Sequence, residues 1–294
     1  AWCLAFAVWF RNRPDQKPGV NEAERQLIRA GAGAETEPAR AAVPWGRLLR
    51  SRTLWMLCLM YFCMSYGWYF NINYLPNYLQ EQHGVKPNDW LGALFQGGPL
   101  IFGAAGCIVG GFLTDRYIRR RGDRLWGRRI FGIVGHVVCV PCYLFCIIAP
   151  SAWTFALAIA LSGFFNDLAM GSAWAACQDV GKRHAAIVAG CMNTVGNLGG
   201  FVATLLTGLI LGWAKTGYLS AHGIDLDALD KAGQLAVLKV ALLPGYNLNF
   251  LIYAVIYGVA VLLWLGIDAT KPVLPEDAAV PPGEAAAETG IPAD

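Results

Sequence analysis

The chain has 294 residues, of which 56% are hydrophobic and only 15% are charged, and its formal net charge is +3. A soluble domain carries about a quarter charged residues, so this composition predicts a surface that faces lipid. It argues against a soluble enzyme, and the basic residues form no pattern that would indicate a nucleic-acid site.

The first ten residues are apolar and are followed by Arg11 and Arg13. Ten residues rise only about 15 Å in an α-helix, whereas the hydrocarbon core of a bilayer is about 30 Å thick. A secretory signal begins with positive residues, and this stretch ends with them. We therefore expect residues 1–10 to be the end of a truncated transmembrane helix, and the chain to be a fragment.

Residues 11–53 are polar and charged and include four prolines. Asn21, followed three residues later by Glu24, has the form of a capping box and predicts the start of a short amphipathic helix. No apolar run in this segment is long enough to cross a bilayer. We expect residues 11–53 to form a loop in the cytoplasm.

Six apolar runs follow, and each has about 20 residues or more, the length that crosses a bilayer as a helix. They contain no Lys or Arg, and Asp167 is their only carboxylate residue. No run alternates as a membrane β-strand does. The runs span residues 54–79, 90–114, 130–149, 152–177, 185–214 and 248–267. The sequence thus predicts an all-α membrane protein.

The six runs together define a transmembrane bundle over residues 54–267. The remaining segment, residues 268–294, is rich in Ala, Pro and Glu, and we expect a disordered tail there.

Lys and Arg are unevenly distributed among the connections. Nineteen of the 23 lie in residues 11–53, 115–129 and 178–184 and in the tail, and four lie in the connections between them. Because cytoplasmic loops carry the excess of Lys and Arg, the first set is predicted to be cytoplasmic. We therefore expect a multi-pass protein of the cell inner (plasma) membrane with both chain ends in the cytoplasm.

A motif at the end of the second run points to a family. The stretch 111–116 reads Gly-Phe-Leu-Thr-Asp-Arg, and Gly-Arg-Arg follows at 127–129. This pattern resembles the cytoplasmic signature loop of the major facilitator superfamily. The longer form with residues 117–126 inserted resembles the anion:cation symporter family, which includes sugar-acid and organic-anion transporters. The signature residues are Gly111, Asp115, Arg116, Gly127, Arg128 and Arg129.

Two further stretches resemble that family, namely residues 174–181 with 192–200, and residues 9–24. The resemblance implies a twelve-helix fold made of two halves, of which this chain supplies helices seven to twelve. The partner would be the missing N-terminal six-helix half. In the family, the proton-linked acidic residues and the arginine that binds the substrate carboxylate generally lie in that half.

Polar side chains at helical spacing suggest where a substrate could bind. One stripe runs along the first span from Tyr66 to Asn77, and another along the fifth from Asn193 to Thr207. Either stripe could line a cavity or pack against a neighbouring helix. Together with the family resemblance, the spacing predicts the substrate-binding residues Tyr66, Asn73, Trp174, Asn193 and Asn197.

The remaining candidates are Asp167, His136 and three cysteines, and a structural role is possible for each of them. Asp167 is either proton-linked or structural, because a carboxylate inside a bilayer must be paired, protonated or turned to the interior. His136 lies within the third run, and we expect it to be a packing residue there. Cys139, Cys142 and Cys146 share a helical face, but no second cysteine pair follows, so we expect packing and neither a metal nor a cofactor.

The sequence therefore predicts a secondary active transporter, with proton-coupled symport of small organic anions such as sugar acids. The alternative is a six-span channel or permease subunit that is not coupled to protons. An intramembrane serine enzyme is disfavoured, because the Gly-x-Ser-x-Gly elbow does not occur around Ser172.

The uneven distribution of basic residues gives a direct test of orientation. An impermeant thiol reagent applied to intact cells should label His83→Cys and spare Arg120→Cys, because position 83 is predicted outside and position 120 inside. Opening the cells before labelling should expose both positions. The reverse pattern on intact cells would invert the topology.

Overall fold

The computed structural model describes residues 2–11, 14–17, 19–32 and 43–274. The described residues form helices and no strands, which confirms the predicted all-α class. The chain divides into two compact units, residues 1–45 and 46–294, which we describe separately.

The first unit holds the short helices α1 (Trp2–Trp9), η1 (Pro14–Gln16) and α2 (Glu22–Ala32). The ammonium group of Lys17 lies 3.6 Å from the centroid of the Trp9 ring. The side-chain oxygen of Asn21 accepts a hydrogen bond of 2.8 Å from the backbone N–H of Glu24, so the predicted helix start is present.

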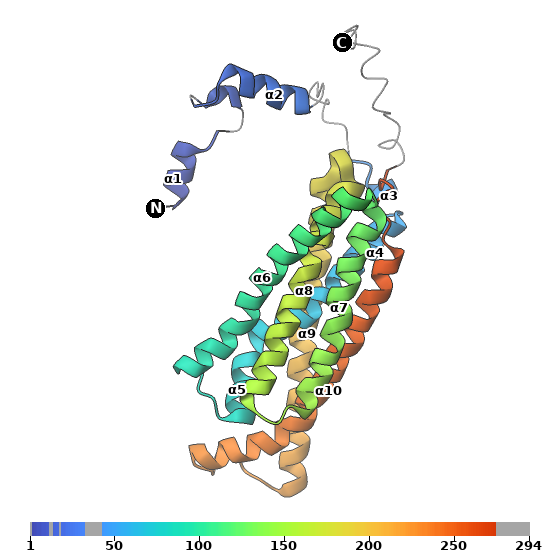
Figure 1. Ribbon diagram of the computed structural model, residues 1–294. Helices are drawn as coiled ribbons and strands as arrows, with labels where there is room; N and C mark the ends of the chain where they lie inside the picture. The colour runs from blue at the N-terminus through green and yellow to red at the C-terminus, as the bar shows by residue number, and fades with distance from the viewer. Residues whose placement is uncertain (1, 12–13, 18, 33–42, 275–294) are drawn as a thin grey trace. The chain divides into compact units, whose positions relative to one another are not determined.

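The second unit is a bundle of six long helices with α3 (Trp45–Leu48) at its start (Figure 1). A helix break after Asn73 separates α5 from α4, and Pro76 lies in the first turn of α5. The remaining elements are α4 (Arg52–Asn73), α5 (Leu75–His83), α6 (Trp90–Arg121), α7 (Arg124–Ile148), α8 (Ala152–Gly181), η2 (Lys182–His184), α9 (Ala185–His222) and α10 (Lys231–Gly266).

Four stretches of the described chain are long and apolar enough to cross a membrane. They are α6, α7, α10 and a 71-residue stretch, Ala152–His222, which contains both α8 and α9. At 1.5 Å per residue that stretch is about 106 Å long, enough for two passes. The predicted first span, α4, is not among them because its tyrosines, tryptophans and asparagines lower its hydropathy; half of its 22 residues are buried in the bundle.

Helices α9 and α10 extend further than the apolar runs. Residues 215–247 were expected to be a connection, but α9 continues to His222 and α10 starts at Lys231. Local caps set these ends: Gly223 takes a left-handed conformation with φ 62°, and the Asp230 side chain accepts a hydrogen bond from Gly233. The helical extensions project from one end of the bundle (Figure 1).

Glycines allow the closest helix contacts. A Cβ atom at Gly106 or Gly110 of α6 would overlap the backbone of Phe164 or Leu168 of α8, and one at Gly199 of α9 would overlap the backbone of α4. Helices α6 and α8 therefore form one tight pair, and α4 and α9 form another. Helix α7 packs on α8 and α10, and α10 also packs on α4 and α9.

Aromatic residues fill the space between α4, α7 and α10. The Tyr143 hydroxyl donates a hydrogen bond of 2.9 Å to the carbonyl oxygen of Gly67, and the Tyr143 ring stacks on Tyr257 with centroids 5.5 Å apart. Phe250 and Tyr253 complete this buried cluster. The cluster fixes α10 against α4 and α7 and so supports the inner side of α4.

The first residues after α10 are packed against the bundle. Val273 and Leu274 are buried, and the N–H of Val273 donates a hydrogen bond of 2.8 Å to the carbonyl oxygen of Val180. The prediction of a disordered tail from residue 268 therefore does not apply to residues 268–274. Residues 275–294 lie outside the described residues.

The glycine contact between α6 and α8 can be tested by adding one methyl group. Gly106→Ala should lower the free energy of unfolding by about 1–3 kcal/mol, because the neighbouring backbone must move. Thermal unfolding in detergent measures the loss. Gly97→Ala on the same helix is the control, since its nearest neighbour would be 4.0 Å away. Equal unfolding temperatures for both variants would refute the contact.

Candidate functional site

A polar cavity of about 160 Å³ lies where α4, α8 and α9 meet. Helices α4 and α9 supply aromatic rings and amides, and α8 supplies an amide and a thioether. The lining residues are Tyr61, Met64, Ser65, Trp68, Tyr69, Asn166, Met170, Asn193 and Asn197. Such a mixture of hydrogen-bonding groups and flat apolar rings suits a small polar molecule with a carbon skeleton.

The two asparagines of α9 differ in how they are used. Asn197 accepts a hydrogen bond of 3.0 Å from the Tyr69 hydroxyl and donates one of 2.8 Å to the carbonyl oxygen of Asn193. The side chain of Asn193 is exposed and, within the described part of the chain, forms no hydrogen bond. Asn197 therefore helps to join α4 to α9, whereas the Asn193 amide is available to a ligand.

Trp174 of α8 borders this cavity. Its indole N–H donates to the Met170 sulfur at 3.2 Å, and its ring meets Tyr61 edge-on with centroids 6.1 Å apart. Trp174 is 37% exposed, so part of the ring is accessible. The predicted residues Trp174, Asn193 and Asn197 thus lie at or beside one cavity.

The other two predicted residues lie elsewhere. Tyr66 is only 2% exposed and packs edge-on against Tyr253, so it faces α10 and the aromatic core. Asn73 donates a hydrogen bond of 2.8 Å to the Thr204 hydroxyl and joins α4 to α9 beyond the cavity. The structure thus gives Tyr66 and Asn73 packing contacts and places neither of them among the residues that line the cavity.

The sequence interpretation also missed residues that line the cavity. Tyr61, Ser65 and Trp68 are spaced at i, i+4 and i+7, a pattern that places them on one helical face. That face lies beside the stripe beginning at Tyr66, and the tyrosines and asparagines of that stripe were the stronger polar signal. Asn166 was overlooked because the neighbouring carboxylate of Asp167 was the more conspicuous group.

Asp167 lies between α8 and α6, next to the cavity wall. Its Oδ1 accepts a hydrogen bond of 2.9 Å from the Asn166 amide, whose own oxygen accepts one of 2.8 Å from the Tyr257 hydroxyl. A Cβ atom at Gly103 of α6 would lie 2.5 Å from Asp167 Oδ2 and 3.4 Å from the Trp68 ring. Gly103 thus provides the room that the carboxyl group occupies.

The signature residues meet at one end of the bundle. Arg128 of α7 pairs with Asp179 of α8 through Nε and Oδ2, which are 2.8 Å apart, and its Nη1 lies 3.9 Å from Asp115 Oδ1 of α6. The Nε–H of Arg129 donates to the carbonyl oxygen of Ile267 at 2.8 Å. These contacts connect α6, α7, α8 and the end of α10.

The other three signature residues, which form no ion pair among the described residues, are Gly111, Arg116 and Gly127. Gly127 lies against Ile118, which leaves no room for a side chain there, whereas a Cβ atom at Gly111 would meet no atom within 4 Å. Arg116 is exposed.

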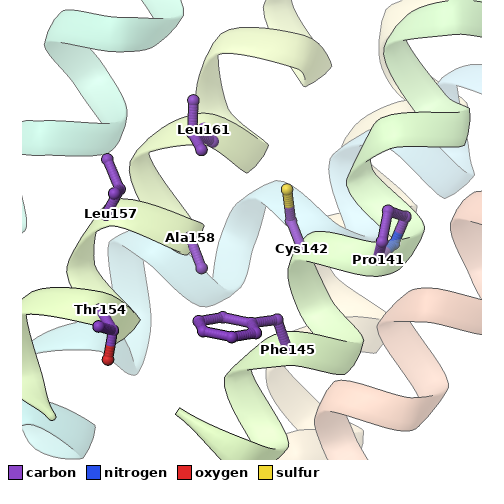
Figure 2. A pocket seen from close by; sticks show the side chains of 7 residues that line it. All are labelled: Pro141, Cys142, Phe145, Thr154, Leu157, Ala158 and Leu161. Carbon is purple, nitrogen blue, oxygen red and sulfur yellow. The ribbon is translucent and has the colours of Figure 1, made fainter. Parts of the chain in front are cut away.

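A larger apolar groove of about 280 Å³ lies between α7 and α8. Figure 2 shows its seven side chains, with Phe145 of α7 pointing toward Ala158 of α8. Thr154 supplies the only side-chain oxygen, and that hydroxyl already bonds within the capping box at the start of α8. The groove lacks groups that could recognise a polar ligand, so the smaller polar cavity is the better candidate site.

Neither a metal site nor a serine–histidine pair is formed by the described residues. Among them no group of three His, Cys, Asp or Glu side chains could hold a metal ion. The buried Ser172 hydroxyl shares a hydrogen bond of 3.0 Å with Thr114, whereas His136 Nδ1 accepts one of 3.0 Å from the Trp264 indole. Ser172 and His136 therefore have separate structural partners.

Titratable groups also meet at the other end of the bundle. Burial raises the pKa of the Glu81 carboxyl group, although the Tyr246 hydroxyl donates to it at 2.6 Å and Lys215 lies nearby. Burial, assisted by the charge of Lys239, lowers the pKa of His83. The hydrogen bond from Tyr246 to Glu81 joins α10 to α5.

Comparison with known proteins identifies the family. The model of the Major Facilitator Superfamily matches residues 1–204. The chain belongs to this superfamily. The resemblance to this superfamily noted from the sequence is therefore confirmed.

The superfamily relatives include anion transporters. The chain is 29% identical to the probable sulfoacetate transporter SauU of Cupriavidus necator, over 81% of this chain and 54% of that protein. It is 28% identical to the probable galactarate/D-glucarate transporter GudP of Escherichia coli, over 70% of this chain and 48% of that protein. The chain thus spans about half the length of these relatives.

A solved structure supports the fold. A bacterial homologue of the human lysosomal transporter Spinster superposes with a TM-score of 0.58 at 18% identity, covering 76% of this chain and 50% of that one. The structural likeness confirms the superfamily fold for this six-helix bundle.

The signature ion pair gives a stability test. Asp179 has a side-chain exposure of 16%, so Arg128→Gln leaves a largely desolvated carboxylate without its partner and should cost about 1–3 kcal/mol. Adding Asp179→Asn should restore part of the loss, because it removes the unpaired charge. Thermal unfolding measures both, with exposed Arg124→Gln as the control. A double variant no more stable than Arg128→Gln would contradict the pairing.

Proposed function

We propose that this chain forms the C-terminal half of a secondary active transporter for small organic anions, and that a proton accompanies the anion. The observation that carries the proposal is the polar cavity between α4, α8 and α9, in which the Asn193 amide is free to bind a ligand. The sulfoacetate and sugar-acid transporters among the relatives support this substrate class.

The cavity supplies neutral binding groups. Amides such as Asn193 suit hydroxyl or sulfonate oxygens, and the Trp174 ring offers a flat surface for a carbon skeleton. The six apolar runs contain no Lys or Arg, and an anion needs a positive partner near the middle of a membrane. We propose that an N-terminal six-helix half supplies that charge, as it generally does in the anion:cation symporter family.

The proposed location is the cell inner (plasma) membrane, with the Arg128–Asp179 end of the bundle in the cytoplasm and the Glu81 end outside. The uneven distribution of basic residues supports this orientation. A channel or permease subunit that is not coupled to protons is the alternative, but no feature of the cavity favours it. An enzymatic role has no support either, because the family relatives are transporters.

The two asparagines of α9 provide a matched test of the proposed site. In a chimaera that joins this chain to the N-terminal half of the Cupriavidus necator relative, Asn193→Ala should raise the KM for uptake about fivefold, because one hydrogen bond to substrate is lost. Its thermal stability should be unchanged. Asn197→Ala should also lower the unfolding temperature, because it removes the bond to Tyr69.

Uptake of radiolabelled sulfoacetate or glucarate into proteoliposomes measures KM, and detergent unfolding measures stability. Unchanged uptake kinetics in Asn193→Ala would exclude this cavity as the substrate site. Uptake that is insensitive to an imposed pH gradient would favour the uncoupled alternative.

A further inference from the structure

Asp167 is a carboxylate in an unusual setting. It lies inside the predicted fourth span and, among the described residues, forms no ion pair. Moving an ionised carboxylate into a low-dielectric interior costs several kcal/mol unless a cation compensates it, so an unpaired group there takes up a proton or meets water.

Among the described residues, the titratable groups around Asp167 include no cation. The titratable groups close enough to interact electrostatically with its carboxyl group are Tyr61 of α4, Cys107 of α6, Cys139 of α7 and Tyr257 of α10. A phenol or thiol has no positive form in which it could neutralise a carboxylate.

The histidine that packs against Tyr257 has other contacts. His136 packs against Tyr257 with ring centroids 5.6 Å apart, and its Nδ1 accepts the hydrogen bond from Trp264. It forms no ion pair with Asp167. The described surroundings therefore favour the neutral carboxylic acid.

The position of the carboxyl group is nevertheless defined by its contacts. Oδ1 is fixed by the Asn166 amide, and Asn166 is fixed in turn by the Tyr257 hydroxyl of α10. Oδ2 accepts no hydrogen bond within the described residues and lies in the space left by Gly103. The two oxygens thus differ, and Oδ2 is the atom at which a proton can bind.

The Asp167 carboxyl group lies next to the polar cavity. Asn166 and Trp68 both line that cavity, and the Trp68 ring lies beside Gly103, as the Asp167 carboxyl group does. Trp68 and Asn166 therefore form the wall between a bound anion and the carboxyl group.

We propose that Asp167 is a proton-binding group of this half of the transporter, held by Asn166 and seated against Gly103. A proton from cavity water adds to Oδ2 and gives a neutral acid, and the reverse step returns it to water, with no change of oxidation state. This inference deepens the proposed function and rests on it, because a bound proton would accompany the anion.

Infrared spectroscopy of this chain in lipid bilayers tests the protonation state without any transport measurement. The spectrum of the unsubstituted chain minus that of Asp167→Asn should contain a carboxylic-acid C=O band at neutral pH that disappears as the pH is raised. A difference spectrum with only the ionised carboxylate bands at neutral pH would overturn the inference.

A second pair of variants assigns the band without replacing Asp167. Tyr257→Phe removes the hydroxyl that fixes Asn166, which weakens the hydrogen bond that favours the ionised form. The midpoint of the band's loss should therefore move upward by as much as roughly one pH unit. Tyr253→Phe, whose hydroxyl pairs with Thr207, should leave it unchanged. Equal midpoints in the two variants would overturn the proposal that Asn166 and Tyr257 hold the Asp167 carboxyl group.

The two proposals fail in different ways. Asp167 found ionised at neutral pH, together with uptake driven by a pH gradient, would overturn this inference and leave the transport proposal standing. A protonated Asp167 together with uptake that does not depend on the pH gradient would support the proton site and overturn the coupling of anion uptake to protons.

Discussion

The close approach of backbones at glycines determines the shape of this bundle. Gly106 and Gly110 let α6 lie directly on α8, and Gly199 lets α9 lie directly on α4. At these glycines the contact is too close to admit a side chain, and the polar cavity lies where the two pairs meet. The aromatic cluster on α7 and α10 packs against α4 and so stabilises the junction.

At the junction one helix carries both a polar group that joins two helices and a polar group that forms no hydrogen bond among the described residues. Helix α9 uses Asn197 to hold α4 and leaves Asn193 free one turn away. Helix α8 places Asn166 in the cavity wall and Asp167 behind it, against α6. A neutral polar surface and a carboxyl group that forms no ion pair among the described residues are thus adjacent, and the proposed transport of an anion together with a proton rests on this arrangement.

The helices and the signature contacts follow from local features of the sequence. Apolar runs located all six long helices of the described chain, and the motif placed Asp115 and Arg128 on either side of the turn between α6 and α7. Of the residues predicted from helical spacing, Asn193 and Asn197 line the cavity and Tyr66 does not, because periodicity identifies a helix face but not the neighbour that covers it. The position of α10 decides that, and Tyr66 faces Tyr253. The helix extensions were missed because caps such as Gly223 and Asp230 end a helix independently of hydropathy.

Substrate protection of position 193 tests the account most directly. In the chimaera with an N-terminal half, Asn193→Cys should react with a small water-soluble thiol reagent above the level of the unsubstituted protein, and sulfoacetate or glucarate should slow that reaction. Gly217→Cys, on the exposed extension of α9, should react at a rate that the anion does not change. Equal reaction rates at position 193 with and without the anion would contradict the assignment of this cavity as the substrate site.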